Sequence, residues 1–562
     1  MRASNENAAQ RMTYSGSLSQ IGILAKKESV LLELPQELAE LHVNGTLHIH
    51  DLDAFGCAPN CLMVDIRKCF PFACLNNRPP LSKILAVFEF IRSTIANLAN
   101  EQTGGIGFGD FDEDLGWLLD MAGADLTNPA TCQLIEGGLV SLIEWINTVR
   151  TRYGLECYYV TLNIGVARSP SGRFIAQMLL NCFRHSLPLF TRPNIVFKVK
   201  GDANLAPGAP NRNLLDQALA LAAERMFPTF FLCDATPIQS IPPSRLAVMG
   251  CRTRVVQNEF GEPGSIGRGN LGYVTINLPR IAANAVESAT RNVVAHFKEN
   301  WDIVANSARR ILMLRFNQLL KRSPMEFPYN FEIGAWSKDF DNPLGIEGVF
   351  QHGTLSVGFV GLAEAVEILG AGKLDDNQTA QSLAYDICAY MRQSVDSYRE
   401  QEGLNFTLLG TSAEYCPGRF ALLDQETLGL PQAKKGYYTN SFHLDVSAEV
   451  HPFRKIGIEG PFHGMCNGGA VTYIEFKEAP IGNSSAIEDL IRAAINAGII
   501  YFGINFPRDI CRLCGNEGVF DNCSTCGSAN IVRLRRVSGY IEDLAYFTSG
   551  KKAEVKRRYP LR

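Results

Sequence analysis

The feature of this 562-residue sequence that most constrains its fold is a cluster of four cysteines near the C-terminus. The four share the spacing C-x2-C-x8-C-x2-C and are Cys511, Cys514, Cys523 and Cys526. Two such pairs surround one ion with four sulfurs in the closed tetrahedral shell typical of structural zinc. Gly515 and Gly527 follow the pairs and fit the tight turns of such a site. Because sulfur takes every position, we expect the metal, zinc or alternatively iron, to stabilise the fold.

A zinc ribbon that binds nucleic acid would carry the same cysteine pattern. The tail supports that alternative, because residues 531–562 hold nine Lys and Arg against three acidic residues. The whole chain, however, has 53 Lys and Arg against 57 Asp and Glu, a formal net charge of -4. Nucleic-acid binding depends on basic side chains that neutralise phosphates. We therefore expect no nucleic-acid partner and keep the zinc ribbon as an alternative.

The rest of the chain alternates helical and strand-like segments. Helical periodicity covers four long segments, at residues 83–102, 213–226, 286–321 and 377–402. Runs rich in β-branched and aromatic residues lie between them, at 157–164, 194–199, 273–278, 471–476 and 499–506. This alternation predicts an α/β fold. The composition changes sharply only near Pro507, so we predict a catalytic domain over 1–506 and a small cysteine-bearing unit over 507–562.

The segment directly behind the cysteines, RRVSGYIEDL at residues 535–544, contains a glycine of special interest. Its RVSGY resembles the C-terminal loop of glycyl radical enzymes, and its place behind a four-cysteine site is similar to that in anaerobic, class III ribonucleotide reductases. The resemblance implies that Gly539 stores a radical. Glycine suits this role because its Cα can flatten and share the unpaired electron with the amide nitrogen and the carbonyl, which a Cβ would hinder. The alternative is that Gly539 only supplies a positive φ in a turn.

Three further segments resemble the same family, in the same order. AVMGCRT at 247–253 is similar to the tip of the family's finger loop and implies that Cys251 forms the thiyl radical. NLGYVTINLPR implies that its first residue, Asn270, lines the substrate site. LHIHDLDAFGCAPNCLMVD at 47–65 implies that Cys61 is the second active-site cysteine. The resemblance therefore extends from about residue 45 to the C-terminus.

This resemblance implies both a fold and a reaction. The implied fold is a ten-stranded α/β barrel made of two antiparallel five-stranded halves, with Cys251 and Gly539 on two loops inside it. The implied reaction converts ribonucleoside triphosphates to 2′-deoxyribonucleoside triphosphates. Cys251 would take the hydrogen from C3′ of the ribose, after which the 2′-hydroxyl leaves as water. Cys61 would act from the other face of the sugar, and Asn270 would hold it by hydrogen bonds.

Thr411 and Ser412 are the predicted ligands of the substrate phosphates. They belong to GTSAE, which follows the strand-like NFTLL, and their hydroxyls and the backbone N–H groups suit phosphate oxygens. A simple strand-ending turn is the alternative. The family also implies a dNTP or ATP specificity site at a homodimer interface, which the sequence does not locate. Only about 45 residues precede HIHDLD, so we expect no ATP-cone domain.

The resemblance implies a separate activating enzyme and an external reductant. The clustered cysteines are spaced for one ion, so the iron–sulfur and S-adenosylmethionine chemistry that forms the Gly539 radical should belong to a radical-SAM activase. Cys61, Cys251 and Asn270 together fit the branch that oxidises formate, and a thioredoxin-like dithiol protein is the alternative reductant. The spare thiols that such a dithiol pathway would use are Cys57, Cys416 and Cys466.

The sequence also bears on location and on rival enzymes. No apolar run has membrane-spanning length, and the start MRASNENAAQRM lacks the features of a secretory signal. We expect a cytoplasmic protein in which most of the 16 cysteines stay reduced. The nearest rival is another glycyl radical enzyme, of the formate-lyase or dehydratase type. The former uses adjacent cysteines, and no Cys-Cys pair occurs in the chain.

Overall fold

One large mixed sheet organises the computed structural model, and a smaller sheet follows it. The structure describes residues 13–151, 156–186, 190–250, 252–288, 292–336 and 345–560. The strands of the large sheet are β1 Leu47–Ile49, β2 Cys61–Val64, β3 Ile106–Phe108, β6 Val160–Ile164, β7 Asn194–Val199, β8 Thr229–Leu232, β9 Arg268–Asn277, β10 Thr354–Val360, β11 Asn405–Gly410, β12 Thr472–Glu475 and β13 Tyr501–Asn505.

Ten of these strands form one continuous path, in the order β11-β10-β9-β2-β3-β6-β7-β8-β13-β12. The neighbours from β2 to β8 are parallel, as are β9 to β11 and β12 to β13. The two junctions β2–β9 and β8–β13 are antiparallel. The α/β class is thus confirmed. Backbone hydrogen bonds join β11 to the segment just before β12, from Gly410 N to Gly469 O and from Gly468 N to Leu408 O. Closure of the sheet into a barrel stays a prediction.

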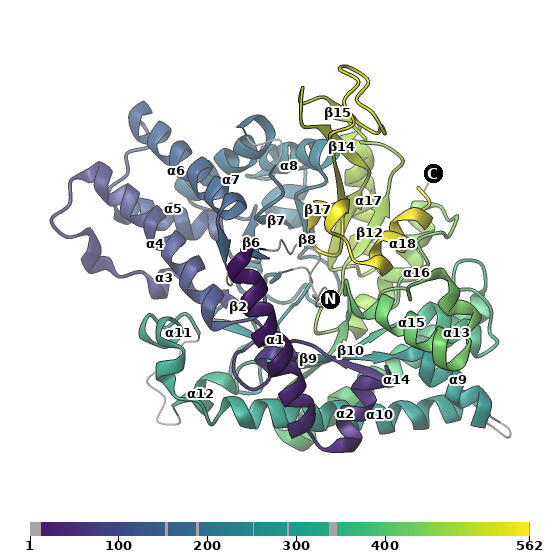
Figure 1. The fold of residues 1–562 in the computed structure, drawn as a ribbon. Coiled ribbons are helices and arrows are strands. Elements are labelled where there is room, and N and C mark those ends of the chain that lie inside the picture. The colour runs from purple at the N-terminus through teal and green to yellow at the C-terminus, as the bar shows by residue number, and fades with distance from the viewer. Residues whose placement is uncertain are drawn as a thin grey trace.

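Helices surround the strands, which gather in the middle of the view in Figure 1. Among the described residues they are α1 Tyr14–Glu33, α2 Gln36–Val43, α3 Ile66–Cys69, α4 Pro80–Glu101, α5 Phe111–Met121, α6 Pro129–Thr148, α7 Pro170–Asn181, α8 Arg212–Arg225, α9 Leu278–Ser288, α10 Val293–Leu319, α11 Pro328–Glu332, α12 Ile346–Phe350, α13 Leu362–Ile368, α14 Gln378–Glu402, α15 Cys416–Leu428, α16 Pro452–Met465, α17 Ser484–Asn496 and α18 Ser549–Arg557. Because helices cover the sheet, strands such as β6, β7 and β10 are buried at every residue.

Each helical or strand-like segment expected from the sequence contains an element of that type, and two of these segments are divided in the structure. The helix expected over 286–321 is two helices, α9 and α10. Asn292 starts the second one, because its side chain accepts a hydrogen bond from Ala295 N at 3.1 Å, as a helix N-cap does. The expected strand 157–164 is also divided, into β5 Glu156–Cys157 and β6. Within the described residues, no helix is long and apolar enough to cross a membrane.

The small sheet begins directly after the last strand of the large one. Its order is β15-β14-β16-β17, all antiparallel, with β14 Arg508–Cys511, β15 Glu517–Gly518, β16 Ile531–Arg536 and β17 Ile541–Asp543. The yellow C-terminal elements lie against the large sheet beside α16 and α17 in Figure 1. This arrangement brings the hairpin between β16 and β17 to the large sheet. The division of the chain at residue 507 stays a prediction.

Candidate active site and candidate metal centre

One pocket beside the large sheet is lined by residues from the distant segments that the sequence singled out; we call it the central pocket. Its lining includes Cys61, Gly250, Arg252, Ser412, Glu414 and Tyr540. These residues come from the start of β2, the loop between β8 and β9, the loop after β11, and the β16–β17 hairpin. Cys251 lies outside the described residues, but both of its neighbours line the pocket.

Cys61 is buried at the first position of β2. Its thiol donates to Asn60 Oδ1 at 2.8 Å and accepts from Gly105 N at 3.2 Å. The glycine-rich GGIGFG makes this close packing possible. A Cβ at Gly104 would lie 2.4 Å from the Cys61 sulfur, and one at Gly105 would lie 2.9 Å from Gly250 Cα. These glycines are therefore explained by the shape of the central pocket, which the sequence analysis did not foresee.

Asn270 is the register partner of Cys61 across the antiparallel β2–β9 junction. Directly opposed residues project to the same face of a sheet, so the two side chains share one side. The Asn270 amide donates to Thr354 Oγ1 and Ser356 Oγ, each at 2.9 Å. Its Oδ1 is buried and has no hydrogen-bond partner within the described part of the chain. Asn270 does not itself line the central pocket, and its role at the substrate site stays a prediction.

The loop that carries Cys251 is a tight reversal of the chain. Met249 N donates to Thr253 O at 2.9 Å, so these two residues, one on each side of position 251 in the chain, pair with each other. Gly250 has a φ of +57°, and its carbonyl accepts hydrogen bonds from Thr161 and Asn194. These contacts fix the backbone immediately before Cys251 against the large sheet.

Gly539 is buried in the four-residue turn that joins β16 to β17. Val537 N donates to Tyr540 O at 3.0 Å and closes the turn. Gly539 is not among the described glycines with a positive φ. The need for a left-handed backbone, which was the alternative explanation of this glycine, is therefore absent. We call residues 537–540 the glycine turn.

A single carboxylate holds both sides of Gly539. Glu414 Oε1 accepts from Ser538 Oγ at 3.1 Å and from Tyr540 Oη at 2.5 Å. Burial, with the nearby Glu414 charge, raises the pKa of Tyr540 well above its usual value. The phenol consequently keeps its proton and donates a hydrogen bond to Glu414. Glu414 is the last residue of GTSAE, but its contacts with the glycine turn had no signal in the sequence.

Arg192 ties the same hairpin to the large sheet. Its guanidinium lies 5.7 Å from the ring centre of Tyr159 and 5.4 Å from that of Tyr540, and it pairs with Glu542 at 2.9 Å. Both ionic partners are nearly buried, so loss of one would leave an uncompensated charge. Sequence spacing offered no signal for this contact, because 350 residues separate the ion pair.

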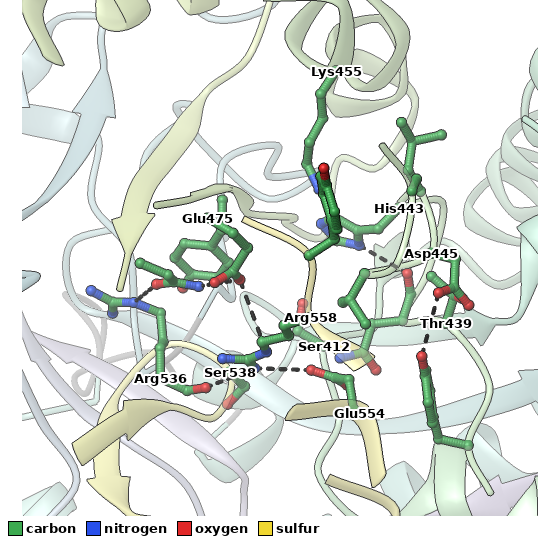
Figure 2. A pocket seen from close by; sticks show the side chains of 18 of the residues that line it. Ser412, Thr439, His443, Asp445, Lys455, Glu475, Arg536, Ser538, Glu554 and Arg558 are labelled. Atoms are coloured by element: carbon green, nitrogen blue, oxygen red, sulfur yellow. Dashed lines mark hydrogen bonds and ion pairs between the residues drawn. The ribbon is translucent and has the colours of Figure 1, made fainter. Parts of the chain in front are cut away.

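The two predicted phosphate ligands differ in their surroundings. Ser412 lines the central pocket, whereas Thr411 is fully buried with its hydroxyl 3.2 Å from Thr275 Oγ1. Ser412 also lines a second pocket, the hairpin pocket, together with Arg536, Val537 and Ser538. Figure 2 shows the hairpin pocket with Ser412 and Ser538 in its lower part. The glycine turn thus adjoins two pockets that share Ser412.

The four clustered cysteines form the candidate metal centre. Their sulfurs all lie within 4.8 Å of one another, with Cys511 and Cys526 at 3.6 Å and Cys514 and Cys523 at 3.4 Å. A tetrahedral zinc site with bonds of about 2.3 Å requires sulfurs about 3.8 Å apart, so this set fits such an ion. Among the described residues, no other group of three or more potential ligands lies this close together. The histidines of HIHDLD therefore belong to no such group. The turns after the pairs have the predicted form, with φ of +75° at Gly515 and +72° at Gly527.

Comparison with known sequences gives one consistent answer. The model of the family described as anaerobic ribonucleoside-triphosphate reductase matches residues 6–560. The anaerobic ribonucleoside-triphosphate reductase of Escherichia coli (strain K12) is 30% identical over 96% of this chain and 80% of its own length. The protein of the same description from Enterobacteria phage T4 is 28% identical over 93% of this chain and 91% of its own.

Comparison with solved structures supports the same fold. A structure described as anaerobic ribonucleotide reductase has a TM-score of 0.76 at 15% identity, covering 98% of this chain and 90% of that one. The Thermotoga maritima anaerobic ribonucleotide reductase in complex with dATP and CTP has a TM-score of 0.72 at 14% identity, covering 97% and 90%. Hydroxyproline dehydratase from Clostridioides difficile reaches 0.66 at 10% identity, covering 95% and 83%.

Proposed function

The chain belongs to the anaerobic ribonucleoside-triphosphate reductase family, and we propose that its central pocket reduces ribonucleoside triphosphates with radicals held on Gly539 and Cys251. The observation that carries this proposal is the convergence at one pocket of Cys61, the two neighbours of Cys251, and Tyr540 beside Gly539. Membership of the family disfavours both the zinc-ribbon alternative and the other glycyl radical enzymes. The enzyme is accordingly an oxidoreductase.

Gly539 and Cys251 divide storage of the radical from its use. Gly539 is buried in a turn held on both sides by Glu414, which protects an unpaired electron on its Cα from solvent. Both neighbours of Cys251 line the same pocket as Tyr540, which supports transfer of a hydrogen atom from the Cys251 thiol to the Gly539 Cα radical. The thiyl radical then takes the C3′ hydrogen of the ribose. This exchange is nearly balanced, because S–H and activated C–H bonds are of comparable strength.

Cys61 and Asn270 act on the substrate from the β2–β9 junction. The buried thiol of Cys61 supplies a proton as the 2′-hydroxyl leaves as water. Once a solvent proton has restored the S–H bond, Cys61 gives a hydrogen atom to C2′, and the external reductant reduces the resulting thiyl radical. The unpartnered Asn270 Oδ1 is an acceptor for a ribose hydroxyl. Ser412 offers its hydroxyl to the substrate phosphates, and Thr411 supports the loop from within the sheet.

Nucleotides also serve as effectors in this proposal. The Thermotoga maritima protein has been solved in complex with dATP and CTP, and with dATP bound in the specificity site. We propose that this chain likewise binds ribonucleoside triphosphates as substrates and dNTP or ATP as specificity effectors, within a homodimer.

The four-cysteine centre has a structural role. Cys511, Cys514, Cys523 and Cys526 would hold zinc, whose bonds to four thiolates stabilise the sheet that carries Gly539. Hydrogen bonding from the backbone N–H of Cys526 lowers the pKa of Cys523 to about 6, which favours a thiolate. The thiolates and the catalytic thiols need a reducing compartment, so we place the protein in the cytoplasm.

Two partners complete the proposed cycle. A radical-SAM activase removes one hydrogen atom from Gly539, and formate or a thioredoxin-like dithiol supplies the two electrons for each turnover. Cys416 lines the central pocket and so remains a candidate for the dithiol route, whereas Cys466 is buried beside Arg254.

The direct test is anaerobic activation by a radical-SAM activase, followed by electron paramagnetic resonance and an assay of CTP and ATP reduction. We expect a glycyl doublet and formation of dCTP and dATP. Parallel assays with formate and with a dithiol protein separate the two reductants. Absence of both the doublet and deoxynucleotide under all these conditions would contradict the proposal.

A further inference from the structure

The carbonyl group of Gly539 has a cationic hydrogen-bond donor. Arg536 lies at the end of β16, three residues before Gly539, and one of its terminal nitrogens donates to Gly539 O at 3.3 Å. The Arg536 side chain is among the largest fully buried ones of the protein. A guanidinium rarely occupies such a place without a strong reason, because burial of a charge is costly.

The guanidinium is held in position by neutral groups. Arg536 Nε donates to Asn505 Oδ1 at 2.7 Å, and its other terminal nitrogen donates to the carbonyl of Met226. Asn505 is oriented in turn by Glu475, whose Oε1 accepts from Asn505 Nδ2 at 2.8 Å. Dashed interactions lead from Arg536 towards Glu475 in Figure 2. The Tyr473 ring, with its centre 5.0 Å away, covers the guanidinium.

The neighbouring arginine shows what is unusual about this arrangement. Arg535 pairs with Asp509 at 2.7 Å and so has its charge neutralised. Arg536 has no ion-pair partner within the described residues. Its guanidinium therefore donates to carbonyl oxygens, including that of Gly539, and the nearby Glu475 carboxylate reaches it only through Asn505.

We propose that Arg536 is a positioning residue that tunes the glycyl radical through the Gly539 carbonyl. This inference rests on the proposed function. A Cα radical in a peptide is stabilised because the amide nitrogen donates electron density and the carbonyl accepts it. A cation hydrogen-bonded to the carbonyl oxygen strengthens the acceptor. Spin density then moves from Cα towards the carbonyl, and the stored radical becomes more stable relative to the thiyl radical.

The Arg536 hydrogen bond therefore sets how strongly the radical is held on Gly539 relative to Cys251. Removal of the Arg536 donor raises the energy of the Gly539 radical, so the radical forms in lower yield and decays faster. It also returns spin density to Cα, and the splitting of the EPR doublet by the remaining α-hydrogen widens. A residue that merely supported the fold would leave that splitting unchanged wherever the radical formed.

The test compares Arg536→Gln and Arg536→Lys with Arg535→Gln in the full-length protein. Each variant is activated anaerobically, and the doublet splitting, the spins per chain and the anaerobic half-life of the radical are measured. We expect a wider doublet and a half-life shortened about tenfold in Arg536→Gln, since a charge-assisted hydrogen bond is lost. The lysine variant keeps the charge, so its doublet splitting and its radical half-life should lie between those of Arg536→Gln and the wild type. Arg535→Gln loses the ion pair with Asp509 and should still show the wild-type doublet splitting.

Zinc content and thermal unfolding report whether each variant is folded. If Arg536→Gln does not fold, the test uses Arg536→Lys and Asn505→Ala. Both variants keep a cation at position 536 and change only its hydrogen bond to the Gly539 carbonyl. A wild-type doublet whose splitting and half-life persist in every folded variant overturns this inference alone. A wild type without a doublet overturns the proposed function, and this inference with it.

Discussion

The four-cysteine centre and the central pocket are built in opposite ways. The centre takes all its ligands from 16 consecutive residues, Cys511 to Cys526, and its geometry follows from two short turns. The central pocket takes its walls from residues as far apart as His50 and Tyr540. Local spacing therefore specifies the first completely, whereas the second exists only when the large sheet has formed. The difference predicts that changes in the centre act through stability and changes in the pocket act through chemistry.

The largest expected effect is that of Gly539→Ala. Because no positive φ is required at this position, alanine should change the free energy of unfolding by about 1 kcal/mol and leave zinc content and nucleotide binding intact. The EPR doublet should nevertheless be lost completely, since a Cβ hinders flattening of the radical. In the activated wild type, oxygen should cut the backbone at Gly539 and release a peptide beginning near Tyr540, which mass spectrometry detects. Equal cleavage of the alanine variant would show that Gly539 is only a turn residue.

Cys251→Ala should separate radical storage from turnover. The variant should bind nucleotide and accept a radical on Gly539, because storage needs no thiol. Deoxynucleotide formation should fall to the background of the assay. Cys74→Ala, at a half-buried cysteine outside the central pocket, is the matched control and should retain activity. Substantial dCTP formation by the Cys251 variant would remove this residue from the mechanism.

Cys511→Ser should act through stability. Loss of one thiolate weakens the metal site, so zinc content should fall and the C-terminal sheet should unfold at a lower temperature. The radical yield should fall with it, because the same sheet carries Gly539. Metal analysis and calorimetry measure both effects, with Cys132→Ser as the control at a cysteine outside the centre. Full zinc and full radical yield would contradict a structural role for this metal.

Glu414→Gln should lower the radical yield moderately. This residue links the central pocket to the hairpin of the sheet that also carries the four-cysteine centre. The amide oxygen can still accept from Ser538 or Tyr540, but the charge that strengthens both hydrogen bonds is gone. We expect the glycine turn to lose about 1–2 kcal/mol of stabilisation, seen as a lower radical yield per chain. The exposed Glu478→Gln should leave the yield unchanged. An unaltered yield in the Glu414 variant would show that the turn does not depend on this carboxylate.

The smallest expected effect is that of Gly515→Ala. This glycine has a φ of +75° with no atom within 4 Å of an added Cβ, so only backbone strain opposes alanine. The cost should be about 1–2 kcal/mol in the free energy of unfolding. The radical should form normally, in contrast to Gly539→Ala. A lost doublet in the Gly515 variant would mean that the glycine turn depends on the exact backbone of the four-cysteine centre.

Regular elements with strong local signals were predicted well. The expected strand at 194–199 is β7 residue for residue, and the expected helix at 377–402 begins at Gln378 and ends at Glu402. The split of 286–321 into two helices was missed, because no Gly or Pro marks the place where α10 begins after its Asn292 cap. Periodicity measures which face is apolar, and it does not register a cap within a continuous pattern.

The sequence by itself determined the candidate metal ligands, the α/β class and the order of the segments that resemble the family, because each depends on residues close together in the chain. Only the tertiary structure decided which side chains meet. Glu414 holds the glycine turn from 124 and 126 residues away, Arg192 reaches Glu542 across 350 residues, and Asn270 stands opposite Cys61 through strand register. The physical reason is that such contacts carry no periodicity or spacing of their own. They appear once hydrophobic burial has assembled the sheet and brought distant polar groups within hydrogen-bonding distance.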